Sequence, residues 1–126
     1  MANEITYSFA LRLSNGDLND QYSSSSLRAD QTTPRLIRNV QDVGFAAAEA
    51  LETGDIVTPG MAVFVNLEPT GGNFIEIGSW VAAAFYPFLR VNPGEQQICR
   101  IGVAAAILYA KADITAVELF YIIYDD

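Results

Sequence analysis

The sequence predicts an all-β protein: a single domain, residues 1–126, built as an antiparallel β-sandwich or jelly-roll-like barrel of about eight short strands. Several segments alternate apolar and polar residues with a period of two, which is typical of strands that bury one face. Gly, Pro and Asn turn signals separate these segments. No helix of useful length intervenes, which argues against a parallel α/β fold.

The N-terminal third combines one regular strand with a long polar stretch. Residues 5–13 alternate strictly and predict a strand with one buried face, and residues 14–17 (SNGD) predict a tight hairpin turn. Residues 18–33 are polar and include four consecutive serines. Such a segment buries little and indicates a weak edge strand or an exposed arm. We therefore hypothesise that residues 18–40 are an extended arm, with a surface loop as the alternative.

The rest of the chain supplies the remaining strands. Residues 34–43 show no clean period, and residues 45–51 (FAAAEAL), although helix-like in composition, are interpreted as a strand. Residues 78–84 predict an irregular connection. Pro87 cannot donate to a ladder, so it belongs at an edge or a bulge. Clearer strands are expected at residues 61–67, 74–77, 85–91, 96–103, 107–112 and 117–124.

The strand at residues 117–124 (VELFYIIY) is the most strand-prone segment of the chain. It is apolar on both faces toward its end. We therefore expect it to lie in the centre of a sheet or against a neighbouring chain.

The residue types needed for common catalytic sites are missing. The chain has no histidine, which removes the commonest general base and the commonest transition-metal ligand. Its single cysteine, Cys99, cannot form an internal disulfide and is interpreted as a small core residue. The glycine-containing segments 54–60 and 68–73 lack the lysine and the helix of a phosphate-binding loop. We expect a protein that is not an enzyme and that uses no cofactor and no metal.

Close pairs of acidic residues do not change this expectation. None lies in a loop that resembles a calcium motif, and each is more simply solvated. The acidic C-terminus is interpreted as a solubilising tail, with contact to a basic patch of a partner as the alternative. The residues concerned are Glu49 with Glu52, Asp17 with Asp20, Asp125 with Asp126, and Glu68 with Glu76, which could face each other across a predicted hairpin.

The net charge of −8, with 15 acidic against 7 basic residues, argues against nucleic-acid binding. The only candidate basic patch is Arg28, Arg35 and Arg38, which Asp30 interrupts. No apolar run is long enough to cross a bilayer, and the N-terminus lacks the pattern of a secretory signal. We expect no nucleic-acid partner, no membrane and no classical export.

Aromatic residues supply further candidate partner-binding positions. Trp80, Phe85, Tyr86 and Phe88 fall close together, and alternation predicts that Phe85 is buried and Tyr86 exposed. Tyr121 and Tyr124 lie on opposite faces of the last strand by parity. An exposed aromatic cluster indicates a protein- or sugar-binding surface, and burial in the core is the alternative. The candidate partner-binding residues are Arg28, Arg35, Arg38, Trp80, Tyr86, Tyr121 and Tyr124.

The chain from Met61 onward carries a characteristic series of segments: MAVFVNLEP, NFIEIGSW, FYPFLRVNPGEQQICRI and LYAKADITAVELFYIIYDD. In its order and spacing the series resembles a family of small virion proteins of tailed bacteriophages. In that family N-x-x-x-F/Y-I/V-E-I-G precedes P-F-L-x-L-x-P-G-E, and L-Y-A-K-A…A-V-x-L-x-Y-x-I closes the chain. The resemblance covers about half of the chain, and residues 14–60 show no match.

The resemblance implies an all-β capsid decoration (cement) protein, made in the host cytoplasm and bound to the outer surface of the major capsid protein lattice. It implies no catalytic residue. On this hypothesis the three arginines of the arm region pair with acidic capsid surface, and the apolar last strand supports a homo-oligomer such as a trimer. A tail, neck or head-fibre component is the nearest alternative. A receptor- or glycan-binding module that uses Trp80 and Tyr86 is a further one, and a β-barrel enzyme or ligand carrier is the least favoured.

Overall fold

The computed structural model describes residues 4–126 and divides the chain into two compact units. The first ends at Thr32 and is called the arm; the second, Thr33–Asp126, is called the body. Residues 4–126 form twelve strands and no α-helix, which confirms the predicted all-β class. The strands outnumber the predicted eight because β1 to β4 belong to the arm and the other eight to the body.

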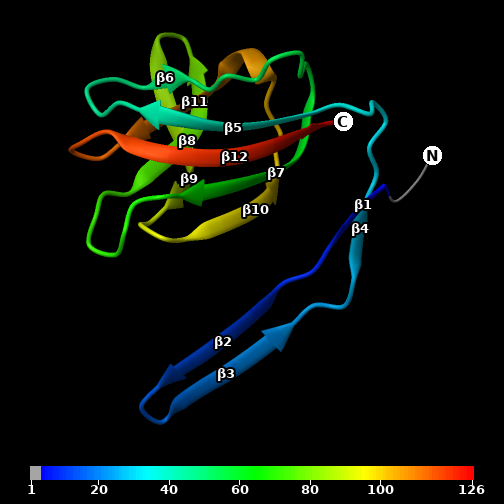
Figure 1. The fold of residues 1–126 in the computed structure, drawn as a ribbon, viewed down its shortest axis with the longest axis vertical. Helices are drawn as coiled ribbons and strands as arrows, with labels where there is room; N and C mark the ends of the chain where they lie inside the picture. The colour runs from blue at the N-terminus through cyan, green and yellow to red at the C-terminus, as the bar shows by residue number, and fades with distance from the viewer. Residues whose placement is uncertain (1–3) are drawn as a thin grey trace. The chain divides into compact units, whose positions relative to one another are not determined.

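The arm contains two antiparallel two-stranded ladders (Figure 1). β1 (Ile5–Tyr7) pairs with β4 (Leu27–Ala29), and β2 (Ala10–Asn15) pairs with β3 (Leu18–Ser23). Gly16 has a φ of +57° between β2 and β3, the conformation that an Asn-Gly hairpin turn requires. The predicted turn is therefore confirmed.

Two predictions for the N-terminal region are wrong. Residues 5–13 do not form one strand with a buried face, because β1 ends at Tyr7 and every residue of β2 is exposed. The alternation is present, but no second layer within the arm covers the apolar side. Nor does the arm extend to residue 40, because β5 (Leu36–Val43) is a strand of the body.

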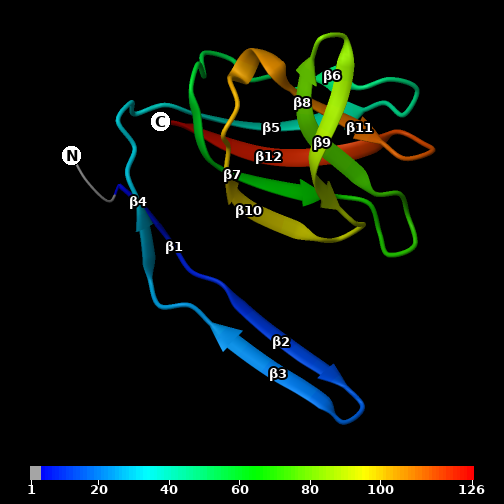
Figure 2. The ribbon, with the colours of Figure 1, turned by 180° about the vertical axis from the view of Figure 1, so that it is seen from behind.

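The body consists of two four-stranded antiparallel sheets. The first, called the β12 sheet, has the order β10-β7-β12-β5, and the second, called the β8 sheet, has the order β6-β11-β8-β9. Numbered 1 to 8 along the body, the strands run 6-3-8-1 and 2-7-4-5, which is the strand order of a jelly roll. Figures 1 and 2 show the two layers from opposite sides. The strands not yet bounded are β6 (Glu49–Ala50), β7 (Pro59–Asn66), β8 (Ile75–Val81), β9 (Ala84–Val91), β10 (Gln96–Arg100), β11 (Leu108–Ala112) and β12 (Val117–Asp125).

The hydrophobic core lies between these two sheets. The β12 sheet contributes alternate residues of β12 and β7, and the β8 sheet contributes residues of β8 and β11. The fully buried members with the largest side chains are Tyr121, Phe64, Ile75, Ile77, Leu108, Leu119 and Ile123. Cys99 packs against this cluster, in agreement with its interpretation as a core residue.

β12 occupies the position that its composition predicts. It pairs with β5 on one side and with β7 on the other, so it is a central strand of the sheet. Burial alternates along the strand from Val117 to Asp125: the odd-numbered residues are buried, and the even-numbered residues are more exposed. The predicted placement of Tyr121 and Tyr124 on opposite faces is confirmed.

Two connections differ from the sequence-based expectation. Residues 45–51 are mostly irregular and contain only the two-residue strand β6, so they form no helix and no long strand. Residues 78–84 are not an irregular connection, because β8 continues to Val81 and turns into β9 at Ala82 and Ala83, which have φ values of 51° and 63°. The single helical segment of residues 4–126 is the three-residue 3-10 turn Ala105–Ile107, so none of the helical structure described is long enough to cross a membrane.

The position of Pro87 agrees with the prediction. β9 is an edge strand of the β8 sheet, and its pairing with β8 shifts register beside Pro87. Gly78 pairs with Pro87 at this bulge, where the two backbones approach closely. A Cβ added to Gly78 would overlap the carbonyl oxygen of Tyr86.

This close approach predicts that Gly78→Ala is strongly destabilising, by about 3 kcal/mol, because the clash is with backbone that cannot rotate away. The measurement is the free energy of unfolding in denaturant. Gly102→Ala is the matched control, since a Cβ at Gly102 meets nothing within 4 Å. Equal stability of the two variants would contradict the described bulge.

Candidate partner-binding surfaces

The β2–β3 hairpin of the arm has one apolar and one polar face. Directly opposite residues share a face, and the register pairs Leu11 with Tyr22, Leu13 with Asp20, and Asn15 with Leu18. The opposite face carries Arg12 with Gln21 and Ser14 with Asn19. Phe9 extends the apolar face, because its ring stacks on Tyr22 with the ring centroids 5.6 Å apart.

The apolar face of the hairpin is exposed. We call it the arm face, and it consists of Phe9, Leu11, Leu13, Leu18 and Tyr22. Its members are 40% to 65% exposed, with Leu11 the most exposed. Asp20 is the one charged residue that shares this face within the β2–β3 register. A contiguous row of exposed large apolar side chains is the feature by which interaction surfaces are recognised.

The body presents a second apolar surface on the outer side of the β12 sheet. The register places Val65, Phe120 and Val40 in one row across the sheet. The next row contains Ile98, Val63 and Ile122, and the row after it contains Tyr124 and Leu36. We call this surface the sheet face, and it consists of Leu36, Val40, Val63, Val65, Ile98, Phe120, Ile122 and Tyr124.

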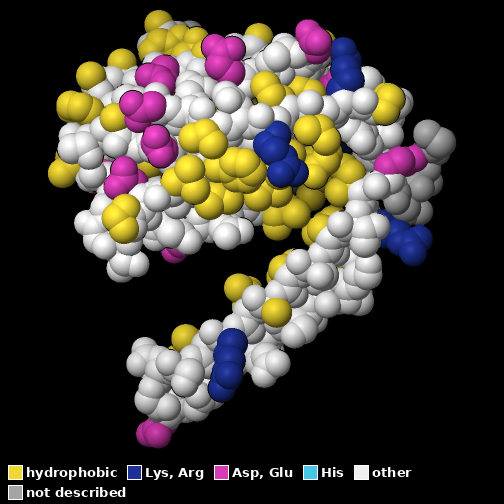
Figure 3. Space-filling model, viewed as in Figure 1, with side chains coloured by type: hydrophobic (Ala, Val, Ile, Leu, Met, Phe, Trp, Pro, Cys, Tyr) yellow, Lys and Arg dark blue, Asp and Glu magenta, His cyan; other side chains and the backbone are white. Residues whose placement is uncertain are grey.

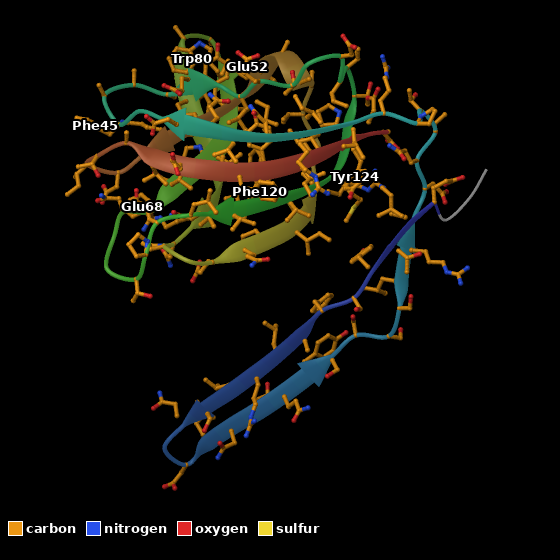
Figure 4. All side chains as sticks on the ribbon, in the orientation of Figure 1. Phe45, Glu52, Glu68, Trp80, Phe120 and Tyr124 are labelled. Atoms are coloured by element: carbon orange, nitrogen blue, oxygen red, sulfur yellow. The ribbon has the colours of Figure 1, made fainter. Side chains whose placement is uncertain are left out.

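The sheet face is only partly covered. Leu36 and Val40, on the edge strand β5, are 54% and 51% exposed. The residues of the sheet face on the central strands, such as Phe120 and Ile122, remain half-buried. Figure 3 shows a continuous apolar area on this side of the body, and Figure 4 shows Phe120 and Tyr124 on β12 there, with Trp80 on the other sheet.

Charges of both signs border the sheet face. Arg38 is opposite Ile122 in the register, and its guanidinium lies 5.9 Å from the centroid of the Phe120 ring. Arg100 is opposite Met61 at the other edge of the sheet, where it lies 3.6 Å from the carboxylate of Asp126. On the same outer side Asp42 lies opposite Glu118, next to Val40 and Phe120. A partner for this surface is therefore expected to combine apolar side chains with charges of both signs.

The structure separates the three predicted arginines. Arg28 is an exposed residue of β4 in the arm, whereas Arg35 and Arg38 belong to the body. Arg35 has a structural role in the body although its side chain is 45% exposed: its Nη2 lies 2.6 Å from Oδ2 of Asp125, which is only 2% exposed. The interpretation of Asp125 as part of a solubilising tail is wrong, because it is buried and also accepts a hydrogen bond from the backbone N–H of Thr58.

Removing one member of this ion pair would leave the other buried and uncompensated. We predict that Arg35→Gln lowers the free energy of unfolding by about 2 to 3 kcal/mol. Arg38→Gln is the matched control on the same strand region and should change stability by less than about 0.5 kcal/mol. Urea denaturation of both variants checks this. Similar losses for both would show that the Arg35–Asp125 pair does not hold the body together.

Tyr121 does not belong to a partner-binding surface, contrary to the prediction, because it is fully buried. Its hydroxyl donates to the carbonyl oxygen of Glu52 at 2.6 Å and accepts from Nδ2 of Asn39 at 3.1 Å. Gln41 joins the same network through its amide, which donates to the carbonyl oxygen of Ala50 and accepts from the backbone N–H of Glu52. These bonds attach the 49–52 segment to the β12 sheet.

Burial raises the pKa of the Tyr121 hydroxyl above its ordinary value. The folded state therefore holds this proton more tightly than the unfolded chain. Stability from this effect is complete below the unfolded pKa of about 10 and is lost as the pH rises through the folded pKa. We predict that the free energy of unfolding falls more steeply above pH 10 in the native chain than in Tyr121→Phe. Denaturation at a series of alkaline pH values measures the two slopes, and equal slopes would contradict the prediction.

The predicted aromatic cluster is only partly exposed. Trp80 stacks on Tyr109 of β11 with ring centroids 5.3 Å apart, so one face of its indole is occupied. Tyr86 is 55% exposed, as alternation predicts, but Phe85 is only half-buried rather than buried and lies opposite Trp80 in the register. Phe88 is also exposed, because the bulge beside Pro87 leaves it without a register partner. Tyr86 and Phe88 are thus two exposed aromatic residues of an edge strand.

The described residues contain no cluster of acidic or sulfur side chains suited to a metal ion. Glu76 does not face Glu68 across a hairpin; it lies opposite Lys111 and 3.6 Å from Arg90. Burial raises the pKa of the Cys99 thiol, which disfavours the reactive thiolate.

Sequence reasoning missed one buried polar residue that organises the loops. Asn66 is 1% exposed, and its amide donates to the carbonyl oxygens of Asn73 and Val91 and accepts from the backbone N–H of Glu68. The alternation of residues along β7 indicated its burial, because Asn66 lies on the same face of the strand as Ala62 and Phe64. It was not recognised because a polar residue at a strand end usually indicates a turn.

Comparison with known proteins gives no match: no protein-family model, no curated protein and no solved structure is significantly similar to this chain.

Proposed function

We propose that the chain is a structural protein of a tailed-bacteriophage virion, a capsid decoration (cement) protein, and that the arm connects it to a neighbouring subunit. The observation that carries the proposal is the arm face, an exposed apolar surface on a two-stranded hairpin. Isolated hairpins are marginally stable in water, so a hairpin of this kind gains stability from a partner. A connecting role explains why its apolar side chains are exposed.

Two further observations support the virion setting. The body has a jelly-roll strand order, an architecture found in viral capsid and lectin domains. This is an analogy of fold, and a fold by itself does not fix a function. The phage-like segments from Met61 onward correspond to β7 through β12, which include the centre of the core.

The physical demands on a cement protein agree with these features. Such a protein binds many equivalent sites and resists internal pressure without performing a reaction. A rigid sandwich supplies a body that does not deform, and an extended segment that adds contacts to a neighbour supplies attachment. The major capsid protein is the proposed main partner, and the exterior of the head is the proposed location.

The proposal predicts two results with particles of a phage that encodes this chain. Its copy number per particle should be comparable to that of the major capsid protein, as quantitative gel or mass-spectrometric analysis would show. Particles that lack it should release DNA at a lower temperature, because the lattice loses the contacts of the decoration layer. Adding purified protein should restore the release temperature.

Matched variants connect this assay to the arm. Leu11→Asp places a charge on the arm face and should fail to restore particle stability. Ser14→Asp adds the same charge on the polar face of the hairpin and should restore it fully. A low copy number with unchanged heat resistance would contradict the cement proposal and favour a tail, neck or head-fibre component.

A glycan- or receptor-binding module is the second candidate function, and the exposed aromatic residues Tyr86 and Phe88 favour it. A glycan-binding screen with Tyr86→Ala and Trp80→Ala tests it. Loss of binding in Tyr86→Ala would support it, and absence of binding by the native chain, together with normal adsorption of particles that lack the protein, would reject it.

A further inference from the structure

We propose that the sheet face of the body is the docking site for the arm face of a second copy of this chain. The inference takes from the proposed function only that the arm is the connecting element, and it names the partner that the arm connects to. The resulting contact is between two different surfaces, so it is heterologous and closes into a ring or a reciprocal dimer when the geometry permits.

The first argument is that both surfaces expose apolar side chains, and a contact between the two surfaces would cover both sets. The arm face is the apolar side of a two-stranded ribbon, and it has no second layer within the arm. The sheet face is the outer side of a four-stranded sheet that already packs its inner side on the core. Sheets bury apolar faces by packing against other sheets. Docking of body on body through the sheet face would leave the arm face bare, whereas arm on body covers both.

The second argument is dimension. The arm face extends from Leu18 to Tyr22 along β3, and the sheet face extends from Leu36 to Val40 along β5. Each is five residues, or about 14 Å, along its strand. A two-stranded ribbon can therefore lie along the sheet face with its apolar rows matched to the rows of the sheet.

The third argument is charge. Asp20 shares the arm face, opposite Leu13. Arg38 borders the sheet face, opposite Ile122 and 5.9 Å from the centroid of the Phe120 ring. An interface between the two surfaces pairs Asp20 with Arg38 only in a register that keeps Asp20 away from Asp42 and Glu118, which lie opposite each other next to Val40 and Phe120. Charge therefore specifies the register of the two strands.

The test is the mass of the purified full-length chain in solution, by size-exclusion chromatography with light scattering. The native chain should be an oligomer. Leu11→Asp in the arm face and Val40→Asp in the sheet face should each give monomers. Ser14→Asp on the polar side of the hairpin and Ile114→Asp in an exposed loop are the matched controls and should keep the native mass. Unchanged far-ultraviolet circular dichroism verifies that each variant is folded.

Mixing the two monomeric variants distinguishes docking on a second copy from the other arrangements. Leu11→Asp retains an intact sheet face, and Val40→Asp retains an intact arm face. Their mixture should therefore form a complex of the two chains that neither variant forms alone. A mixture that stays monomeric overturns the proposal. The proposal is also overturned if Val40→Asp dissociates the oligomer while Leu11→Asp leaves it intact, because that result indicates body-on-body packing.

A charge exchange provides a second readout that misfolding would not mimic. Arg38→Asp and Asp20→Arg should each weaken self-association about tenfold. The double variant should recover the native affinity, and failure to recover would overturn the proposed register. These measurements use no phage particle. A monomeric native chain would therefore reject docking of the arm on a second copy without bearing on the capsid decoration proposal. Absence of the protein from phage particles would reject capsid decoration without changing the mass measured in solution.

Discussion

The body depends on the pairing of its last strand with its first. β12 hydrogen-bonds to β5 along residues 117–124, and its buried residues form the central row of the core. Asp125 continues this row and holds Arg35 through both an ion pair and a backbone hydrogen bond. The two ends of the body are thus joined to each other. Because this pairing is between segments far apart in sequence, the body folds as one unit and cannot form from its N-terminal half alone.

The fold class and most strands of the body were predictable, because their alternation is set by burial of one face against an apolar core. β12 is one clear example, because its composition strongly favours a central strand. The bulge at Pro87 is another, because proline has no backbone N–H to donate within a sheet. β5 was not predicted. Two of its inward-facing residues, Asn39 and Gln41, are polar and are accommodated by the hydroxyl of Tyr121. Because these inward-facing polar residues are accommodated by hydrogen bonds, the segment lacks the alternation of apolar and polar residues that predicts an ordinary strand.

The candidate surfaces were predictable only in part. Alternation in residues 9–13 correctly indicated one apolar side, but whether such a side is buried depends on a second layer that the local sequence does not specify. The three arginines are close in sequence, yet Arg35 pairs with a buried carboxylate while Arg38 borders the sheet face. Parity separated Tyr121 from Tyr124 without showing which of them faces the core. The sheet face itself arises from strands spread over the whole body, so only the register reveals it.

On the proposed function, the division of the chain into arm and body separates attachment from stability. Every residue of the core cluster belongs to the body, from Val43 to Ile123. The arm face can therefore vary without loss of the core, and it can be strengthened or weakened independently of the stability of the sandwich. A hairpin that is only marginally stable alone loses conformational freedom when it docks, and this cost lowers the affinity of each contact. In the repeated assembly that we propose, that cost is acceptable, because many weak contacts formed together give strong overall attachment while each one remains reversible during assembly.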